Sequence, residues 1–161
     1  MSGNTFLEQK FSEICQNKNW EAPLSWCMGG CFVLASFKAF NLKLYQTNTL
    51  GLCDYTIVAT AINPTSAQNA VSTLSRICKK EKIKIISLEG IDTAQWILLD
   101  LGDFIVHVFS ENFREVYDLD SIYKRQTVIE IPEEIYFEGN KAETFVKDTF
   151  NDLDSSERSY F

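Results

Sequence analysis

The chain has 161 residues, of which 45% are hydrophobic and 23% are charged. These values are ordinary for a soluble globular protein, and the length fits one compact domain plus an extension. The net charge of −7 is uneven, because residues 1–110 hold 9 acidic and 9 basic side chains whereas residues 111–161 hold 13 and 6. This balance argues against nucleic acid as the main ligand and favours a basic protein partner.

No membrane or secretory segment is evident. The first residues are polar, and the most hydrophobic window, Trp26 to Phe37, is too short to cross a bilayer. We therefore expect a cytoplasmic protein without a membrane partner.

The cysteines do not form a recognisable metal motif. Their number is odd, no C-x-x-C occurs, and the chain has a single histidine. The five are Cys15, Cys27, Cys31, Cys53 and Cys78. Because a zinc site needs a set of ligands at fixed spacing, we predict no metal and no cofactor, and we interpret the cysteines as core residues kept reduced in the cytosol.

Two helices are predicted in the first 39 residues. Thr5–Glu8 has the spacing of a capping box, and apolar residues follow at helical intervals as far as Cys15. A second helix is predicted from Leu24-Ser25 to about Ala39. The Gly29-Gly30 pair inside it weakens a helix by about 1 kcal/mol per glycine relative to alanine.

Strand and helix signals then alternate. Leu42–Leu44 and the β-branched run Asp54–Thr60 predict two strands, and Lys84–Leu88 predicts a third. A helix is predicted to start here, with Asn63 as its N-cap and Pro64 as its first helical residue. An apolar stripe at a period of 3.6 marks this helix: Ala67, Ala70, Val71, Leu74, Ile77 and Cys78. Lysines that favour the helix dipole follow at its end: Lys79, Lys80 and Lys82.

The most informative stretch is Glu89–Phe109, which predicts a β-hairpin with strands Gln95–Leu101 and Phe104–Phe109. The turn is centred on Leu101-Gly102 or on Gly102-Asp103, and both registers give the same faces. Successive strand residues point to opposite faces. One face is wholly apolar and is expected in the core: Ile97, Leu99, Leu101, Phe104, Val106 and Val108. The other face is mixed: Trp96, Leu98, Asp100, Ile105, His107 and Phe109. We expect a partner to bind the mixed face, because this face holds aromatic and charged groups on a rigid scaffold.

The order of elements predicts an α/β (α+β) fold, a mixed twisted sheet of about five strands flanked by helices. Glu111–Tyr117 is expected to form a short helix, which Leu119–Tyr123 continues or repeats. We divide the chain into an N-terminal helical region (1–36), an α/β domain (37–131) and an acidic, solvated C-terminal extension (132–161). Lys141–Phe150 could add one more helix.

Residues between Phe37 and Tyr123 resemble the ribosomal silencing factors, the Iojap-like proteins, and the resemblance is densest from Glu89 to Leu119. The residues that carry it are Glu89-Gly90, Ala94, Trp96, Leu99-Asp100, Gly102-Asp103, Val106-His107-Val108-Phe109, Arg114, Tyr117 and Leu119, with Lys38-Ala39 and Cys53-Asp54-Tyr55 upstream. Many proteins contain a Gly-Asp turn, but few combine these residues in this order.

The resemblance implies a domain related to the nucleotidyltransferase fold but not used as an enzyme. It implies binding to the large ribosomal subunit through a basic ribosomal protein at the subunit interface, the fourteenth of the large-subunit set. A protein seated there sterically blocks the small subunit and represses translation when nutrients are short. The resemblance also implies a homodimer when the protein is free.

The chain departs from the family pattern in several places, and the long stretch before Phe37 and the acidic tail are also not typical of it. After the second strand the family usually shows Gly-x-Ser-x-Arg, whereas this chain has Ala61-Ile62-Asn63-Pro64-Thr65. Asn63 still suits a helix cap, but the basic residue is replaced by Thr65. Tyr123 stands where a tryptophan is usual. These changes bear on binding strength and partner identity rather than on the hairpin.

We predict that Trp96, Leu98 and Asp100 form a docking patch, which Asp103, His107 and Tyr117 shape or flank. Trp96 is either covered by a helix or exposed for binding, and the resemblance favours binding, because tryptophan, tyrosine and arginine dominate interface energies. His107 has no second histidine beside it, so a contact or structural role is favoured over catalysis. Arg114 lies on the same edge as Tyr117 or pairs with a nearby helix carboxylate.

Two other functions remain as alternatives. The first is a magnesium-dependent nucleotidyltransferase-like enzyme that uses Asp100 and Asp103, or the D-x-D of Asp118 and Asp120. No Gly-Ser turn suited to phosphates supports it, so we interpret the D-x-D as ordinary surface charge. The second is a dimeric adaptor unconnected with ribosomes.

Overall fold

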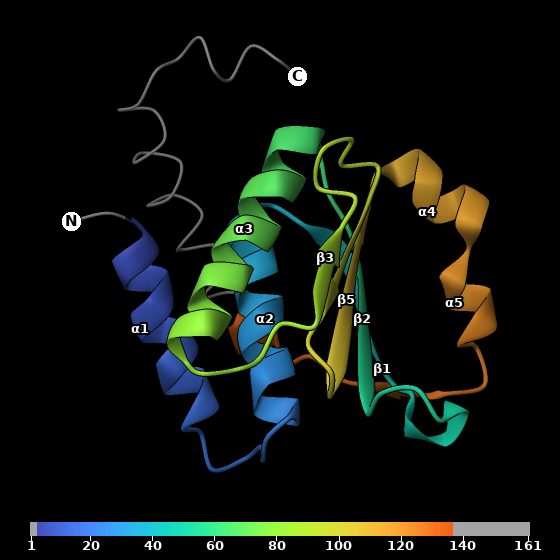
Figure 1. Cartoon of the computed structure of the whole chain (residues 1–161). Helices are drawn as coiled ribbons and strands as arrows, with labels where there is room; N and C mark the ends of the chain where they lie inside the picture. The colour runs from blue at the N-terminus through green and yellow to red at the C-terminus, as the bar shows by residue number, and fades with distance from the viewer. Residues whose placement is uncertain (1–2, 137–161) are drawn as a thin grey trace, which may run out of the picture.

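The computed structural model describes residues 3–136, which form three layers around a six-stranded mixed sheet (Figure 1). The strand order is β3-β4-β5-β2-β1-β6, with β2 and β5 parallel and the other neighbours antiparallel. The bounds are β1 Phe40–Gln46, β2 Tyr55–Thr60, β3 Ser87–Glu89, β4 Trp96–Asp100, β5 Phe104–Phe109 and β6 Thr127–Ile129. The predicted fold class is confirmed.

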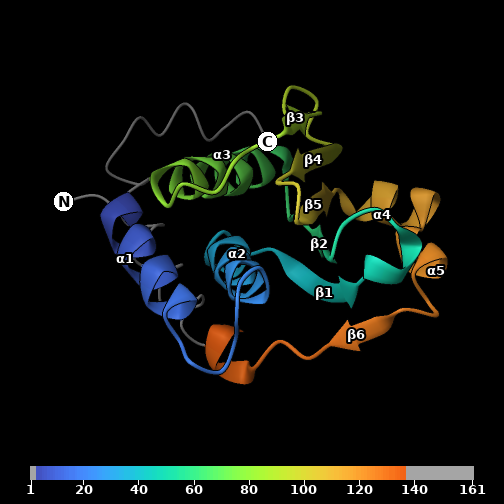
Figure 2. The same cartoon turned by 60° about the horizontal axis from the view of Figure 1, so that its bottom comes forward.

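Helices cover both faces of this sheet. Three lie on the side of one face, which we call the inner face, and the first of these packs mainly on the other two helices and not on the sheet itself. Two lie against the opposite, outer face (Figures 1 and 2). The inner helices are α1 Gly3–Cys15, α2 Leu24–Ser36 and α3 Pro64–Lys80, and the outer helices are α4 Glu111–Tyr117 and α5 Leu119–Ile122. A short 3₁₀ helix, η1 Asn48–Leu50, follows β1. The two sides therefore bury two separate sets of side chains.

The predicted hairpin and its faces are confirmed, and the structure has the second of the two turn positions that the sequence left open. Trp96 pairs with Phe109 and Asp100 with Ile105, so even-numbered residues face odd-numbered ones. The turn is Gly102-Asp103, because Leu101 N donates to the Phe104 carbonyl. All six residues of the apolar face are buried in the inner core: Ile97, Leu99, Leu101, Phe104, Val106 and Val108.

The predicted start of α3 is also confirmed. Asn63 is the N-cap, and its side-chain oxygen accepts a hydrogen bond from Ser66 N at 2.7 Å. Pro64 occupies the first turn, where no backbone donor is needed. Two helix ends were predicted wrongly. α1 begins at Gly3, so Thr5 lies inside the first turn instead of capping it. α2 ends at Ser36 and not near Ala39, because the backbone turns at Lys38 (φ 67°).

The sheet has six strands among the described residues, one more than predicted. β6 (Thr127–Ile129) was missed because it has only three residues and its Val128 is 55% exposed, so it carries no apolar alternation. β3 is shorter than the predicted Lys84–Leu88. Short edge strands are stabilised by their neighbour's ladder and leave little local signal.

The predicted helical region 1–36 shares its core with the sheet. Leu7 and Phe11 of α1 are fully buried in the same cluster as Ile57 of β2. Ile135, which lies in the predicted extension, is 4% exposed and joins that core as well. The predicted helix Lys141–Phe150 lies outside the described residues.

α2 is buried almost all round, and its two adjacent glycines have different neighbours. A Cβ on Gly29 would lie 2.6 Å from two ring atoms of Phe11, so the glycine lets α1 approach closely. A Cβ on Gly30 would meet Ile57 at 3.6 Å and Leu74 at 3.7 Å, which are ordinary contacts.

These contacts predict opposite effects for two neighbouring substitutions. Gly29→Ala should lower the free energy of unfolding by about 1 kcal/mol, because overpacking costs about 1–3 kcal/mol and outweighs a helix-propensity gain of about 1 kcal/mol. Gly30→Ala should raise it by up to about 1 kcal/mol, because only the propensity gain applies. Urea denaturation of both variants measures the difference, and equal effects would contradict this packing.

Candidate functional site

The outer face of the sheet is only partly covered. α4 and α5 lie over β1, β2 and β5, where four side chains form a buried outer cluster: Tyr45, Val58, Phe109 and Tyr123. Beyond these helices, on β4 and the adjoining side of β5, the outward side chains are only half-buried. We call this half-covered area the outer patch, and it consists of Trp96, Leu98, Asp100, Ile105 and Tyr117.

Trp96 lies at the border between the outer cluster and the outer patch. Its ring centroid is 4.9 Å from that of Phe109 and 5.0 Å from that of Tyr117, the last residue of α4. The indole is half-buried and is not sealed beneath a helix. Tyr117 is 48% exposed, so the two rings together present an aromatic surface to solvent.

His107 holds the indole from the sheet side. Trp96 Nε1 donates a hydrogen bond to His107 Nδ1 at 3.1 Å. The imidazole is 6% exposed, and burial lowers its pKa from 6.5 to about 4. It is therefore neutral near pH 7, with an acceptor at Nδ1 and the proton at Nε2. His107 thus lies behind Trp96 and is not itself a surface group.

The hairpin turn holds the two aspartates of the predicted site differently. Asp100 is half-buried, and its Oδ1 accepts a hydrogen bond from Gly102 N at 2.9 Å. Gly102 has φ 84°, a left-handed conformation that glycine adopts easily. Asp103 is exposed, and its backbone carbonyl accepts from Asp54 N at 2.9 Å, which ties the turn to the start of β2.

The entry to β4 explains the Glu89-Gly90 pair. Gly90 has φ 82°, and a Cβ there would lie 2.0 Å from the Trp96 carbonyl oxygen. Only glycine can occupy this position, because the obstacle is backbone. Glu89 pairs with Leu98 across β3 and β4, so its exposed carboxylate shares the face of the outer patch.

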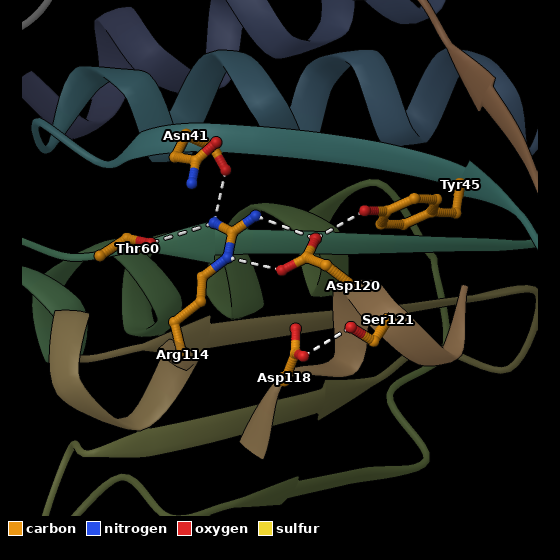
Figure 3. Close-up of polar contacts among 7 residues, drawn as sticks. All are labelled: Asn41, Tyr45, Thr60, Arg114, Asp118, Asp120 and Ser121. Atoms are coloured by element: carbon orange, nitrogen blue, oxygen red, sulfur yellow. Dashed lines mark hydrogen bonds and ion pairs between the residues drawn. The ribbon is translucent and has the colours of Figure 1, made fainter. Parts of the chain in front are cut away.

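A buried ion pair fixes the outer helices to the sheet (Figure 3). Arg114 of α4 is 7% exposed, and its Nε donates to Asp120 Oδ2 at 3.0 Å. A second guanidinium nitrogen donates to Asp120 Oδ1 at 3.2 Å, and the third to Thr60 Oγ1 of β2 at 3.0 Å and to the Asn41 carbonyl of β1. The Tyr45 hydroxyl donates to Asp120 at 2.5 Å. Two strands and α5 therefore converge on one side chain of α4.

The interpretation of the D-x-D as ordinary surface charge was wrong for Asp120. Its partial burial raises the carboxyl pKa, but hydrogen bonds from Arg114 and Tyr45 outweigh this and hold the pKa below its ordinary value. Burial first, and then the Asp120 carboxylate, raise the pKa of the Tyr45 hydroxyl. The alternative that Arg114 pairs with a nearby helix carboxylate is confirmed, because Asp120 of α5 lies six residues along the chain. Sequence reasoning missed Tyr45 and Thr60, because they lie 75 residues from Asp120 and 54 residues from Arg114.

The two carboxylates of the D-x-D have different partners and do not converge on one point. Asp118 turns the chain in a left-handed conformation (φ 44°) and accepts from Ser121 Oγ at 2.5 Å, whereas Asp120 points to Arg114 (Figure 3). Within residues 3–136, no group of three or more His, Cys, Asp or Glu side chains could hold a metal ion. The D-x-D therefore does not bring its two carboxylates together as a pair of metal ligands.

The model of a family described as "Ribosomal silencing factor during starvation" matches residues 31–157, most of the chain and all of the outer patch. The chain belongs to this family. The resemblance in Glu89–Leu119 is thereby confirmed, and membership supports a role as a ribosomal silencing factor. The family consists of ribosome-associated regulators and not of known enzymes.

Individual relatives are distant. Ribosomal silencing factor RsfS of Halalkalibacterium halodurans is 29% identical over 80 residues, which cover 50% of this chain and 68% of the relative. The factor of the same name from Haemophilus influenzae is 32% identical over 72 residues, 45% of this chain and 71% of that one. The mitochondrial Iojap-related protein of Arabidopsis thaliana is 29% identical over 101 residues, 59% of this chain and 54% of that protein.

Solved structures share the fold. A crystal structure from Chromobacterium violaceum has a TM-score of 0.58 at 22% identity and covers 72% of this chain and 85% of that chain. One from Bacillus halodurans has a TM-score of 0.56 at 26% identity and covers 63% of this chain and 92% of that chain.

Among the described residues, none of the helices has both the length and the apolar composition that crossing a bilayer requires.

The Arg114 contacts predict a large loss of stability in Arg114→Ala. We expect the free energy of unfolding to fall by roughly 2–3 kcal/mol. This is below the 3–5 kcal/mol typical of a broken buried pair, because the Asp120 side chain is 31% exposed. Lys80→Ala is the control: it breaks an ion pair with Glu8 in which the lysine is 68% exposed, so it should cost less than about 1 kcal/mol. Urea denaturation compares them, and similar losses would contradict the assigned role of Arg114.

Burial of neutral His107 predicts that stability depends on pH. The unfolded chain binds this proton near pH 6.5 and the folded chain only near pH 4, so the unfolded state binds more protons between them. The free energy of unfolding therefore has its full value above pH 6.5, and it falls by about 3 kcal/mol as the pH drops to 4. His107→Asn should remove this dependence, measured by urea denaturation at pH 7.0 and 4.5. Asp120 contributes little to the difference between pH 7.0 and 4.5, because its carboxyl pKa in the folded protein is held below the ordinary value of 3.8, so its effect on stability appears at lower pH.

Proposed function

We propose that this protein silences ribosomes by docking its outer patch on a basic protein of the large subunit, where it sterically blocks the small subunit and represses translation. The observation that carries the proposal is the family match over residues 31–157 together with the half-covered aromatic and acidic surface that β4 presents. We also propose, as family membership suggests, that the free protein is a cytoplasmic homodimer.

The chemistry of the outer patch supports a basic partner. Trp96 and Tyr117 offer aromatic rings next to the aliphatic Leu98, and rings of this kind dominate interface energies. The carboxylates of Asp100 and Glu89 lie on the same face, at the rim of that apolar centre. An apolar centre with an acidic rim is complementary to a basic protein surface.

Steric occlusion requires affinity and bulk but no bond chemistry. The side chains of the patch are positioned by strands and by a hydrogen-bonded turn, so little conformational entropy is lost when a partner binds. Asp103 and His107 contribute as supports of the patch: the first through its backbone carbonyl and the second through the indole.

Trp96→Ala should weaken binding to purified large subunits by about 2 kcal/mol or more, close to thirtyfold in Kd, if the indole is a central contact. Gradient co-sedimentation with large subunits measures the binding. Addition of small subunits then tests whether wild-type protein prevents subunit joining and the variant does not.

Leu52→Ala is the matched control, because Leu52 is 72% exposed, follows η1, and lies outside the outer patch. It should bind like the wild type. Unchanged affinity in a correctly folded Trp96→Ala protein would exclude the outer patch as the docking surface, and wild-type protein that ignores large subunits would exclude the proposed function.

A further inference from the structure

Five of the 15 basic residues of the chain gather at one end of α3 and in the loop beyond it. Residues 76–84 hold five basic side chains and one acidic one, although the whole chain has 15 basic and 22 acidic residues. The five are Arg76, Lys79, Lys80, Lys82 and Lys84, and all are exposed. We call them the basic end. It follows from helix geometry that they lie within the last turns of α3 and the loop beyond.

The backbone presents these side chains in a fixed arrangement. Ile83 N donates to the Cys78 carbonyl at 2.8 Å and Lys82 N to the Lys79 carbonyl at 3.1 Å, the hydrogen-bond pattern of a Schellman motif. Ile83 is 4% exposed and belongs to the inner core. Its burial anchors the loop, so Lys82 and Lys84 are held on either side of it at the surface.

Lys82 occupies a position that glycine would fill better. It is the residue of the Schellman motif that adopts the left-handed conformation, with φ 62°. That conformation is strained for a residue with a Cβ, and glycine is the usual choice there. The chain therefore carries a cation at a position where glycine would be more stable, which suggests that the charge serves binding.

We propose that the basic end binds the phosphate backbone of RNA and gives the protein a second contact on the large subunit. This inference rests on the proposed function, because it places the RNA next to the docking site of the outer patch. α3 lies on the inner side of the sheet and α4 on the outer side (Figure 1). The loop after α3 brings Lys84 toward the outer patch, because Ile86 N, two residues further on, donates to the Asp100 carbonyl at 2.8 Å.

The composition of the basic end favours backbone contacts over base reading. Its exposed side chains are lysine, arginine and one glutamate, and no aromatic ring stands among them to stack on a base. Lysine is a flexible point charge that binds phosphate without demanding a particular geometry. Contacts of this kind position a protein on nucleic acid and carry no sequence information.

The first test measures how salt affects binding to large subunits. A variant with Lys79→Gln, Lys82→Gly and Lys84→Gln should bind about tenfold or more weakly at 50 mM KCl. The slope of log Kd against log salt concentration should fall by about two, since each phosphate contact contributes about 0.7–0.9. Lys80 is left intact because it pairs with Glu8. An unchanged slope would overturn the inference.

The matched control removes the same charge elsewhere. Lys18→Gln, Lys124→Gln and Arg125→Gln change three exposed basic residues away from α3, and this variant should keep the wild-type slope. Equal losses in both triple variants would mean that net charge matters and the basic end does not, which also overturns the inference.

Lys82→Gly alone separates binding from folding. The urea midpoint should rise, because glycine relieves the left-handed strain, while binding to large subunits should weaken about threefold at 50 mM KCl through the loss of one phosphate contact. A structural role for this lysine predicts the opposite stability change. Unchanged binding in this more stable protein would count against the inference.

A last measurement identifies the partner without the ribosome. Fluorescence anisotropy with a 20-base-pair RNA duplex of arbitrary sequence should show salt-sensitive binding by the wild type and not by the basic-end variant. Polyglutamate of similar charge should compete poorly. If polyglutamate binds and RNA does not, the partner is an acidic protein and the proposal is wrong. The duplex assay stands even where wild-type protein ignores large subunits, so failure of the proposed function is distinguishable.

Discussion

The guanidinium of Arg114 is the group on which the outer half of the structure depends. A buried cation is costly unless it is paired and hydrogen-bonded. Here Asp120 accepts two of its hydrogen bonds, and a hydroxyl of β2 and a carbonyl of β1 accept two more. These contacts can form only when α4 and α5 lie across β1 and β2. The ion pair therefore decides which part of the outer face is covered and which part, on β4, stays open.

The same constraint prepares the outer patch. α4 ends at Tyr117, and once Arg114 is fixed the tyrosine ring comes to rest 5.0 Å from Trp96. His107 holds the indole from the other side through one hydrogen bond. Two buried polar groups that never reach the surface thus set the orientation of the rings that do. A partner meets side chains already in place, which lowers the entropic cost of binding.

The sequence predicts well where the information is local. Strict alternation in Glu89–Phe109 was enough for the hairpin and its faces, although it left two turn registers open, and the Asn63 cap with its apolar stripe was enough for α3. Only part of the Arg114 site is local: Asp120 lies six residues away and fits the predicted alternative of a nearby helix carboxylate, whereas Asn41 and Thr60 lie 73 and 54 residues away. The sequence around His107 also does not indicate that its neighbour Phe109 is buried in the outer cluster, beneath the helices that the Arg114–Asp120 ion pair fixes to the sheet. β6 carried too few residues for a pattern at all.

The net charge of the chain and the charge of any one surface are also different quantities. A net charge of −7 argues against nucleic acid as the main ligand, and that argument holds for the acidic rim of the outer patch. It does not hold for every surface, because electrostatic recognition depends on the field within about one Debye length, about 8–10 Å at physiological salt. Arg76, Lys79 and Lys80 lie on α3, on the inner side of the sheet, whereas the acidic rim lies on the outer face. Lys84 comes closer to that rim, because Ile86 N, two residues further on, donates to the Asp100 carbonyl at 2.8 Å. A protein that must lie between a basic protein and an anionic backbone needs patches of both charges, because a uniformly charged surface would be repelled by one of the two partners.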